Sequence, residues 1–324
     1  MGWRCTGLRW PGDAPELGWE NGRARRGSVL VYGSELGFRA LGERTCVGAR
    51  GNACPLGASV PGRSTGARCA ECARLDRQHS VAADTVADDP RTYRVYLAWF
   101  GPGMVKVGIT AEERGAARLR EQGAVVFSWL GRGPLMAARR TEEVLRAALG
   151  VPDRIPYARK RAVRGVLPDA RERGGEVAEL YGRAAALEGR GWPESLERLP
   201  YEAVDHAEIF GLAAPGTAAG AVREPGAAVG AVRGLVAGGG VAGRLVAAAG
   251  PDLHLATGGG DGAGGVVVVL DTRLMTGWEL VRAAGAPPGS GADGGGRGGS
   301  GGWGPAVTVP VEDLGPGTVQ DGLF

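Results

Sequence analysis

Four cysteines between positions 46 and 72 are the side chains best placed to act together chemically. Seven residues separate Cys46 from Cys54, fourteen more precede Cys69, and Cys69 and Cys72 form a C-x-x-C turn. Such a turn lets two thiolates bind one tetrahedral cation, and four thiolates favour zinc. Because four protein ligands leave no open position for water, we predict a structural zinc site.

Two alternatives to zinc remain open for these cysteines. They could pair as disulfides, although a reducing cytoplasm disfavours such pairs, or they could be unrelated buried thiols. Cys5 stands apart near the N-terminus and is not expected to be a ligand. His79 follows Cys72 by seven residues and could replace one ligand, but we expect it to be a solvated loop histidine.

The segment that follows the cysteines has the pattern of a small α/β domain. Tyr93, Val95 and Leu97 alternate with Tyr96, as in a strand with two different faces. A short Gly-Pro-Gly-Met connection leads to a second alternating strand over residues 105–110, which predicts a hairpin. The order ββαβα is completed by a helix over 112–122, a strand over 125–130 and a helix over 134–149.

These strands carry a signature that resembles that of the GIY-YIG endonuclease superfamily. It consists of Arg94-Val95-Tyr96, Lys106-Val107-Gly108, Thr110, Arg118 and a glutamate on the second helix. Over residues 28–165 the chain also resembles a bacterial family of unknown function that joins a cysteine cluster to a GIY-YIG-like domain. The resemblance rests on Cys-x7-Cys-Pro, C-x-x-C, Val-Tyr-Leu-Ala, Lys-Val-Gly-Ile-Thr and Glu-Gln-Gly-Ala.

The resemblance implies a role for three side chains. In that superfamily a strand tyrosine helps to activate water, a helical arginine holds the phosphate, and a helical glutamate binds one divalent metal, Mg or Mn. Tyr96, Arg118 and Glu142 would take these roles here. Read from the sequence alone, Tyr96 could equally be a core aromatic residue and Arg118 a solvated cation.

Two neighbouring glutamates compete for the metal-binding role. On a helix, Glu142 flanks the apolar stripe of Ala138 and Leu145, whereas Glu143 points nearly opposite to it. A carboxylate at the edge of a buried face is costly unless it is paired or metal-bound. We therefore choose Glu142.

One departure from the superfamily pattern bears on catalysis. Lys106 replaces the second signature tyrosine, and Gln122 stands where a histidine often follows the arginine helix. A lysine can hold a phosphate, but it activates water poorly unless its pKa is strongly lowered. Hydrolysis therefore stays open.

A second group of cations follows the last predicted helix of this domain. Arg159, Lys160, Arg161 and Arg164 form the densest basic run of the chain. Such a run could contact nucleic-acid phosphates without regard to base sequence. A solvated basic helix explains it equally well.

Composition favours nucleic acid over a membrane as the partner. The net charge of the 324 residues is only +3, yet residues 91–192 hold 19 Arg or Lys against 11 Asp or Glu. A field of this sign attracts polyanions. With no apolar run long enough to span a bilayer, we expect a cytoplasmic protein without a membrane partner.

The expected fold class is α+β, divided linearly along the chain. We predict a short β segment (1–42), a zinc cluster and linker (43–87), a GIY-YIG-like domain with a helical extension (88–195) and a Gly-rich β unit (196–324) with a flexible linker (286–304). The leading hypothesis is a nucleic-acid-binding protein that could also be a metal-dependent endonuclease. The rivals are a catalytically inactive binding module with structural zinc and a protein-interaction scaffold.

Overall fold

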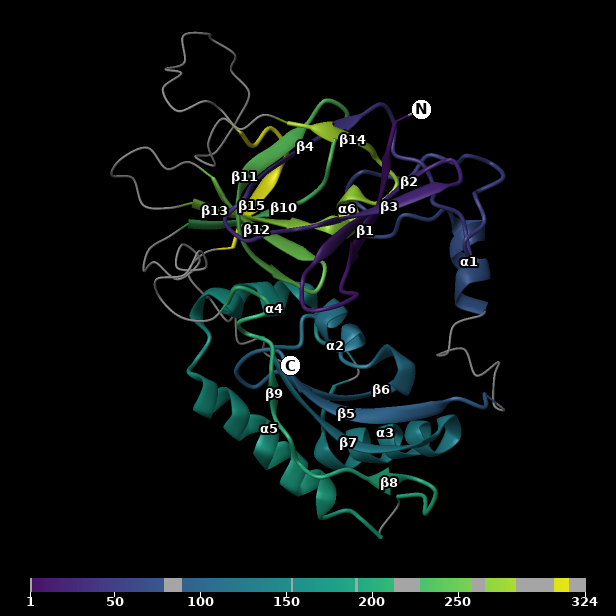
Figure 1. Ribbon diagram of the computed structural model, residues 1–324, viewed down its shortest axis with the longest axis vertical. Coiled ribbons are helices and arrows are strands. Elements are labelled where there is room, and N and C mark those ends of the chain that lie inside the picture. The colour runs from purple at the N-terminus through teal and green to yellow at the C-terminus, as the bar shows by residue number, and fades with distance from the viewer. Residues whose placement is uncertain are drawn as a thin grey trace. The chain divides into compact units, whose positions relative to one another are not determined.

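The computed structural model describes most of the chain, with several gaps. The described residues are 2–78, 89–152, 154–189, 192–212, 228–257, 266–283 and 306–314. The chain divides into unit 1, made of residues 1–78 and 213–324, and unit 2, made of residues 79–212 (Figure 1). Both units mix strands with helices, so the α+β class is confirmed. The predicted linker at 286–304 lies outside the described residues.

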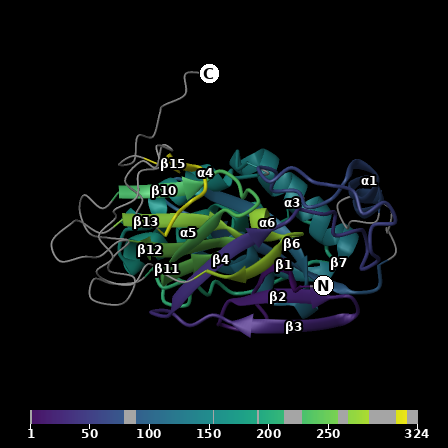
Figure 2. The same ribbon diagram turned by 90° about the horizontal axis from the view of Figure 1, so that it is seen from above.

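Unit 1 contains one sheet of ten strands in the order β15-β10-β13-β12-β11-β4-β14-β1-β2-β3, and Figure 2 shows β10, β13, β12 and β11 side by side. Its N-terminal elements are β1 (Arg4–Arg9), β2 (Glu16–Asn21), β3 (Ala24–Val29), β4 (Glu35–Leu41) and α1 (Ala70–Gln78). Its C-terminal elements are β10 (Ala228–Val232), β11 (Gly240–Ala249), β12 (Asp252–Thr257), β13 (Val266–Asp271), α6 (Thr272–Met275), β14 (Glu279–Arg282) and β15 (Val311–Asp313).

The central strands of this sheet are aliphatic and buried. β13 begins with four valines, whose β-branched side chains suit a pleated surface. Nearly every residue of β11 and β12 is buried. Continuous apolar runs of this kind are typical of strands covered on both faces.

The two ends of the chain meet inside this sheet. β4 pairs with both β11 and β14, and β14 in turn pairs with β1. The N-terminal β segment and the Gly-rich unit, which the sequence suggested as separate pieces, therefore share one hydrogen-bonded ladder.

A buried arginine joins the same two ends through polar contacts. Arg44 is 1% exposed. Its guanidinium donates hydrogen bonds of 2.6 to 2.8 Å to the carbonyl oxygens of Pro61, Ser64, Arg273 and Thr276. Burial lowers the pKa of Arg44, and the charge of Asp271 acts in the opposite direction. One side chain thus supports both halves of unit 1.

Unit 2 is built around a smaller sheet in the order β6-β5-β7-β8, with β9 also paired to β7. Its strands are β5 (Thr92–Trp99), β6 (Val105–Ala111), β7 (Val126–Pro134), β8 (Glu197–Arg198) and β9 (Val204–Asp205). Its helices are η2 (Glu112–Arg114), α2 (Ala117–Gln122), α3 (Leu135–Leu149), α4 (Tyr157–Val163), η3 (Arg164–Val166) and α5 (Ala170–Ala185).

Each face of this sheet has its own apolar cluster. Tyr93, Val95 and Leu97 pack with α3 and α5 on one face, whereas Tyr96 and Phe127 pack with α2 on the other (Figure 1). The alternation predicted for the first strand and the hairpin from β5 to β6 are both confirmed. These two clusters fix the sheet that positions the predicted site residues.

The helix predicted over residues 112–122 is interrupted. A 3₁₀ turn, η2, ends at Arg114, and α2 begins only at Ala117. Gly115 lies between them with a φ of 47°, a left-handed value that an α-helix does not contain. The prediction of one continuous helix over residues 112–122 was therefore wrong at its centre.

Candidate functional site

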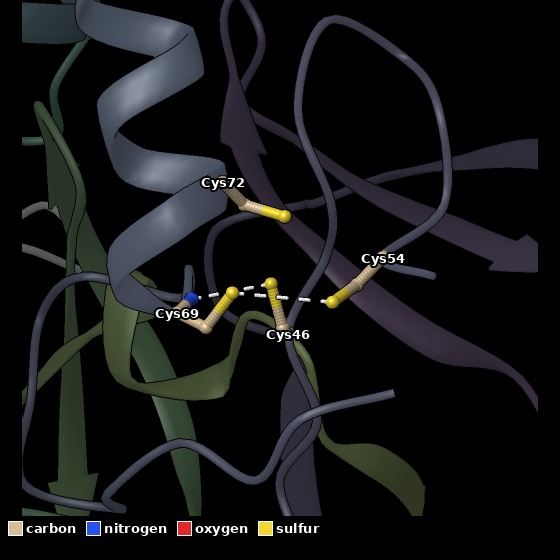
Figure 3. A group of neighbouring side chains, drawn as sticks. All are labelled: Cys46, Cys54, Cys69 and Cys72. Carbon is tan, nitrogen blue, oxygen red and sulfur yellow. Dashed lines mark hydrogen bonds between the residues drawn. The ribbon is translucent and has the colours of Figure 1, made fainter. Parts of the chain in front are cut away.

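The four predicted cysteines converge on one point of unit 1 (Figure 3). Their Sγ atoms all lie within 4.8 Å of one another, and those of Cys54 and Cys69 are 4.0 Å apart. A tetrahedral zinc site with Zn–S distances near 2.3 Å places its sulfurs about 3.8 Å apart. The cluster could therefore bind a metal such as zinc with small side-chain adjustments.

Loop and helix residues hold the cysteines in place. Cys69 and Cys72 lie at the start of α1, while Cys46 and Cys54 come from loops (Figure 3). The backbone N–H groups of Gly48 and Cys69 donate to the Cys46 sulfur at 3.4 and 3.2 Å. Gly48 has a φ of 77°, and a Cβ atom there would collide with the carbonyl oxygen of Asn52. Glycine is thus required for this tight turn.

The thiols of the cluster differ in their ease of ionisation. Backbone N–H groups, first that of Ala58 and then that of Leu56, lower the pKa of Cys54 to about 6. Burial, and after it the neighbouring cysteines, raise the pKa of Cys72 to about 12. Several thiolates so close together repel one another, and a bound cation is what would stabilise them.

In unit 2, the Gln122 side chain bridges two of the predicted site residues, Lys106 and Tyr96. Lys106 Nζ donates to Gln122 Oε1 at 3.1 Å, and Gln122 Nε2 donates to the Tyr96 hydroxyl at 3.0 Å. An ammonium group can only donate, so Lys106 determines which end of the amide faces Tyr96. We call Tyr96, Lys106 and Gln122 the amide-bridged triad.

A glycine makes room for the tyrosine of this triad. Gly108 is the cross-strand partner of Tyr96, and a Cβ atom at position 108 would overlap the Tyr96 hydroxyl and ring. The Lys106-Val107-Gly108 motif therefore supplies a cation and a bare backbone in one strand.

Arg118 and Glu142 act electrostatically on the same hydroxyl. Burial raises the pKa of Tyr96, the hydrogen bond from Gln122 and then the charge of Arg118 lower it, and the charge of Glu142 raises it. Arg118 is exposed, and its guanidinium lies 3.7 Å from the carboxylate of Glu121. Glu142 is half-buried, whereas Glu143 is exposed. Hydrogen bonds thus join Tyr96 and Lys106 through Gln122, while Arg118 and Glu142 influence Tyr96 by charge alone, and Tyr96 itself is only 2% exposed.

The basic run after α3 does not form one exposed surface. Lys160 is 4% exposed, donates to the carbonyl oxygen of Gln122 at 2.9 Å and lies over the ring of Phe100. Arg164 is 1% exposed. Both were predicted to contact nucleic acid, and burial contradicts this because a phosphate backbone cannot reach them. Arg159 is exposed and Arg161 is half-buried.

Gln122 was not recognised as a site residue from the sequence. A signal was present, because Gln122 is the last residue of α2 before Gly123, whose φ of 71° ends the helix. A polar side chain at such an end can turn back toward the sheet.

None of the helices that the structure describes combines the length and the apolarity needed to cross a lipid bilayer.

Comparison with known proteins assigns a family to the chain. No curated protein and no solved structure matches it. A family model described as "Protein of unknown function (DUF2797)" matches residues 33–280, a stretch that includes the cysteine cluster and all of unit 2. Because this match covers more than half of the sequence, the chain belongs to that family.

Proposed function

We propose that unit 2 binds nucleic acid through its phosphate groups, at Lys106 and Arg118. The observation that carries the proposal is the amide-bridged triad, which holds a lysine ammonium beside a tyrosine hydroxyl. In the GIY-YIG superfamily that this segment resembles, the helical arginine holds the phosphate of a phosphodiester. An exposed guanidinium such as that of Arg118 suits phosphate, because it can pair with two oxygens at once.

The protonation state of Tyr96 supports binding more than water activation. Its pKa is raised, chiefly by burial, so the phenol stays protonated at neutral pH. The Tyr96 oxygen accepts the hydrogen bond from Gln122, which leaves its proton to be donated. A protonated and almost fully buried hydroxyl of this kind holds Gln122, and through it Lys106, in place and does not remove a proton from water.

Phosphodiester hydrolysis with Mg or Mn is a second candidate function. It is favoured by Glu142, whose half-buried carboxylate acts on the Tyr96 hydroxyl together with Arg118. A carboxylate oxygen is a ligand that Mg²⁺ prefers. The metal would polarise the phosphate and supply the nucleophile that a lysine in place of tyrosine cannot activate.

For the cysteine cluster we propose structural zinc. Cys46, Cys54, Cys69 and Cys72 would occupy all four tetrahedral positions and leave none for a substrate. The site would then brace the loops of unit 1 and take no part in the chemistry of unit 2.

Salt-dependent binding tests the first candidate. A labelled single-stranded oligonucleotide is titrated with the full chain at several salt concentrations and followed by fluorescence anisotropy. We expect Lys106→Met and Arg118→Ala each to weaken binding about tenfold and to reduce the salt slope by about 1. Arg140→Ala, which removes another exposed helical arginine, is the matched control. Binding that ignores salt would favour a protein-interaction scaffold instead.

A cleavage assay tests the second candidate. The purified chain is incubated with single-stranded, duplex and branched substrates in Mg²⁺ or Mn²⁺. Glu142→Gln should abolish cleavage and Glu143→Gln should leave it intact, because Glu142 is half-buried and its charge acts on Tyr96, whereas Glu143 is exposed. No cleavage by the unaltered chain, together with intact salt-dependent binding, would identify a binding module.

A further inference from the structure

Unit 1 contains a hollow of about 480 Å³ beside the cysteine cluster. We call it the β3 hollow. Strands β1, β2 and β3 contribute one side, the cysteine loops another, and the region around α6 a third. This volume lies within the range of sites that hold small organic ligands, about 300–1,000 Å³.

The lining of the β3 hollow is strongly basic. Five arginines line it, namely Arg9, Arg25, Arg26, Arg68 and Arg273. Glu20 is the one carboxylate among the residues that line it. A concave surface of one charge sign concentrates ligands of the opposite sign.

Three of these arginines already have carboxylate partners. Arg9 pairs with Glu16, Arg68 with Asp76 and Arg273 with Asp271. Within the described part of the chain, no carboxylate forms an ion pair with Arg25 or Arg26. Both are exposed on the edge strand β3, where Glu20 is the cross-strand partner of Arg25 without forming an ion pair with it.

Aromatic rings accompany these two arginines. Trp19 lines the hollow and is the cross-strand partner of Arg26. The Arg26 guanidinium lies 4.1 Å from the centroid of the Trp3 ring, a cation–π contact that orients it. Guanidinium groups interleaved with aromatic rings are typical of surfaces that bind single-stranded nucleic acid, where bases stack and phosphates pair.

Hydroxyl groups complete the lining. Thr6, Thr65 and Thr276 each contribute to the hollow. Gly18 keeps the strand side open, since a Cβ atom there would collide with the hydroxyl of Thr6. Hydroxyl donors suit the oxygens of a phosphate or a sugar.

We propose that the β3 hollow binds a nucleotide, either free or as one unit of a single strand. Arg26 holds its phosphate on the strand face that it shares with Trp19, whose ring stacks on the base, and Arg25 adds positive charge from the opposite face of β3. This site goes beyond the function proposed for unit 2, because every residue that lines it belongs to unit 1.

The cysteine loops form part of the wall of the same hollow. Val47, Gly51 and residues 65–68 line it, and Arg68 Nε donates to the carbonyl oxygen of Gly48 at 3.0 Å. A change in the cluster would therefore alter the shape of the hollow.

The test measures ligand affinity with changes confined to β3. A fluorescein-labelled oligothymidylate and, in a separate arm, thymidine monophosphate are titrated with the full chain and with Arg25→Ala/Arg26→Ala. Arg23→Ala is the matched control, because Arg23 is exposed in the same hairpin but does not line the hollow. We expect the double variant to bind at least about tenfold more weakly and the control within about twofold. Since all three arginines are exposed, these variants should fold, and the urea midpoint verifies this.

The Trp19 ring provides a second readout. A base stacked on this ring should quench tryptophan fluorescence, and Trp19→Phe should lose most of the quenching while Arg23→Ala keeps it. Competition by the mononucleotide would identify a free nucleotide as the ligand, whereas binding of the oligonucleotide alone would identify a strand. Both results support the site.

Other outcomes overturn the inference. Equal affinity of the Arg25→Ala/Arg26→Ala variant and the Arg23→Ala control would exclude the hollow as a phosphate site. If Lys106→Met and Arg118→Ala weaken binding while the β3 changes do not, the function proposed for unit 2 stands and this inference fails. If only the β3 changes weaken binding, the reverse holds. If the unaltered chain bound neither the oligonucleotide nor the mononucleotide, both proposals would be wrong.

Discussion

The two units reach a stable sheet by different routes. Unit 2 takes all its strands from the continuous segment 92–205 and covers both faces with apolar clusters. Unit 1 draws its strands from both ends of the chain and joins them by the pairing of β4 with β11 and β14, while Arg44 adds polar bonds between the same two parts and the four cysteines meet in the N-terminal loops. Changes in the loops or in the long-range contacts of unit 1 should therefore leave the stability of unit 2 largely unaffected.

Of the changes that test this contrast, loss of a cysteine ligand should have the largest effect on the stability of unit 1. We expect Cys69→Ser to lose the bound metal and to destabilise unit 1 by about 3 kcal/mol or more, because metal binding is coupled to the ordering of its ligand loops. Metal content per chain and hydrogen exchange report the two effects. Exchange should accelerate in the cysteine loops and remain unchanged in β5 and β7.

Cys5→Ala is the control for that experiment. Cys5 is fully buried but lies outside the cluster, so its replacement should keep the metal. If Cys69→Ser accelerated exchange equally in both units, the proposed separation of their stabilities would be wrong.

Removal of the buried guanidinium should have the next largest effect. Arg44→Met leaves four carbonyl oxygens without their donor, and each buried unsatisfied group costs about 1–3 kcal/mol before relaxation and water entry. We expect a net loss of about 3 kcal/mol in unit 1, measured by urea unfolding of the full chain. Arg44→Lys should recover only part of it, because an ammonium cannot span all four acceptors. A loss under about 1 kcal/mol would show that the two ends do not depend on this residue.

Overpacking of the triad should have a smaller effect, confined to unit 2. Gly108→Ala forces the buried Tyr96 ring to move, which should cost about 1–3 kcal/mol and break its bond to Gln122. Gly174→Ala in α5 is the contrasting control, because nothing lies within 4 Å of the added methyl group. That change should stabilise the helix by up to about 1 kcal/mol. Equal urea midpoints for the two variants would contradict the close contact between Tyr96 and position 108.

The smallest effect concerns an acidic residue at the entry to β5. Hydrogen bonds from the Arg91 side chain, the Arg91 N–H and the Tyr93 hydroxyl hold the pKa of Asp89 well below its usual range. The charged carboxylate therefore stabilises unit 2 above its unfolded pKa, near 3.9, and this contribution is lost as pH falls through the lower folded value. Asp89→Asn should be less stable than the unaltered chain at neutral pH, and the difference should shrink below about pH 4. A difference that stays constant with pH would exclude this network.

Local patterns predicted the parts of the molecule that depend on neighbours in sequence. Alternation identified β5 and β6, and spacing identified the four cysteines, because a strand face and a C-x-x-C turn are each set within a few residues. The pairing of β14 with β4 and β1 left no such signal. Its partners are distant in sequence, as are Arg44 and Thr276, which are 232 residues apart.

The basic run shows why charge alone did not predict exposure. Tyr157, Lys160 and Arg164 follow a helical spacing that places them on one face, and the Lys160 ammonium lies over the rings of Phe100 and Tyr157. That face packs inward, whereas Arg159 points outward. Treating the four cations as one surface ignored this periodicity.

The position of β14 has a consequence for how the chain folds as it is synthesised. The N-terminal strands β1 and β4 flank β14, so their shared ladder cannot close until the ribosome has translated past residue 282. All of unit 2 leaves the exit tunnel before then, so it can fold as a unit while the C-terminal strands of unit 1 are still being synthesised. The cysteine loops follow directly after β4 and emerge before unit 2, so an early encounter with a metal would order them before β14 is available to complete their sheet.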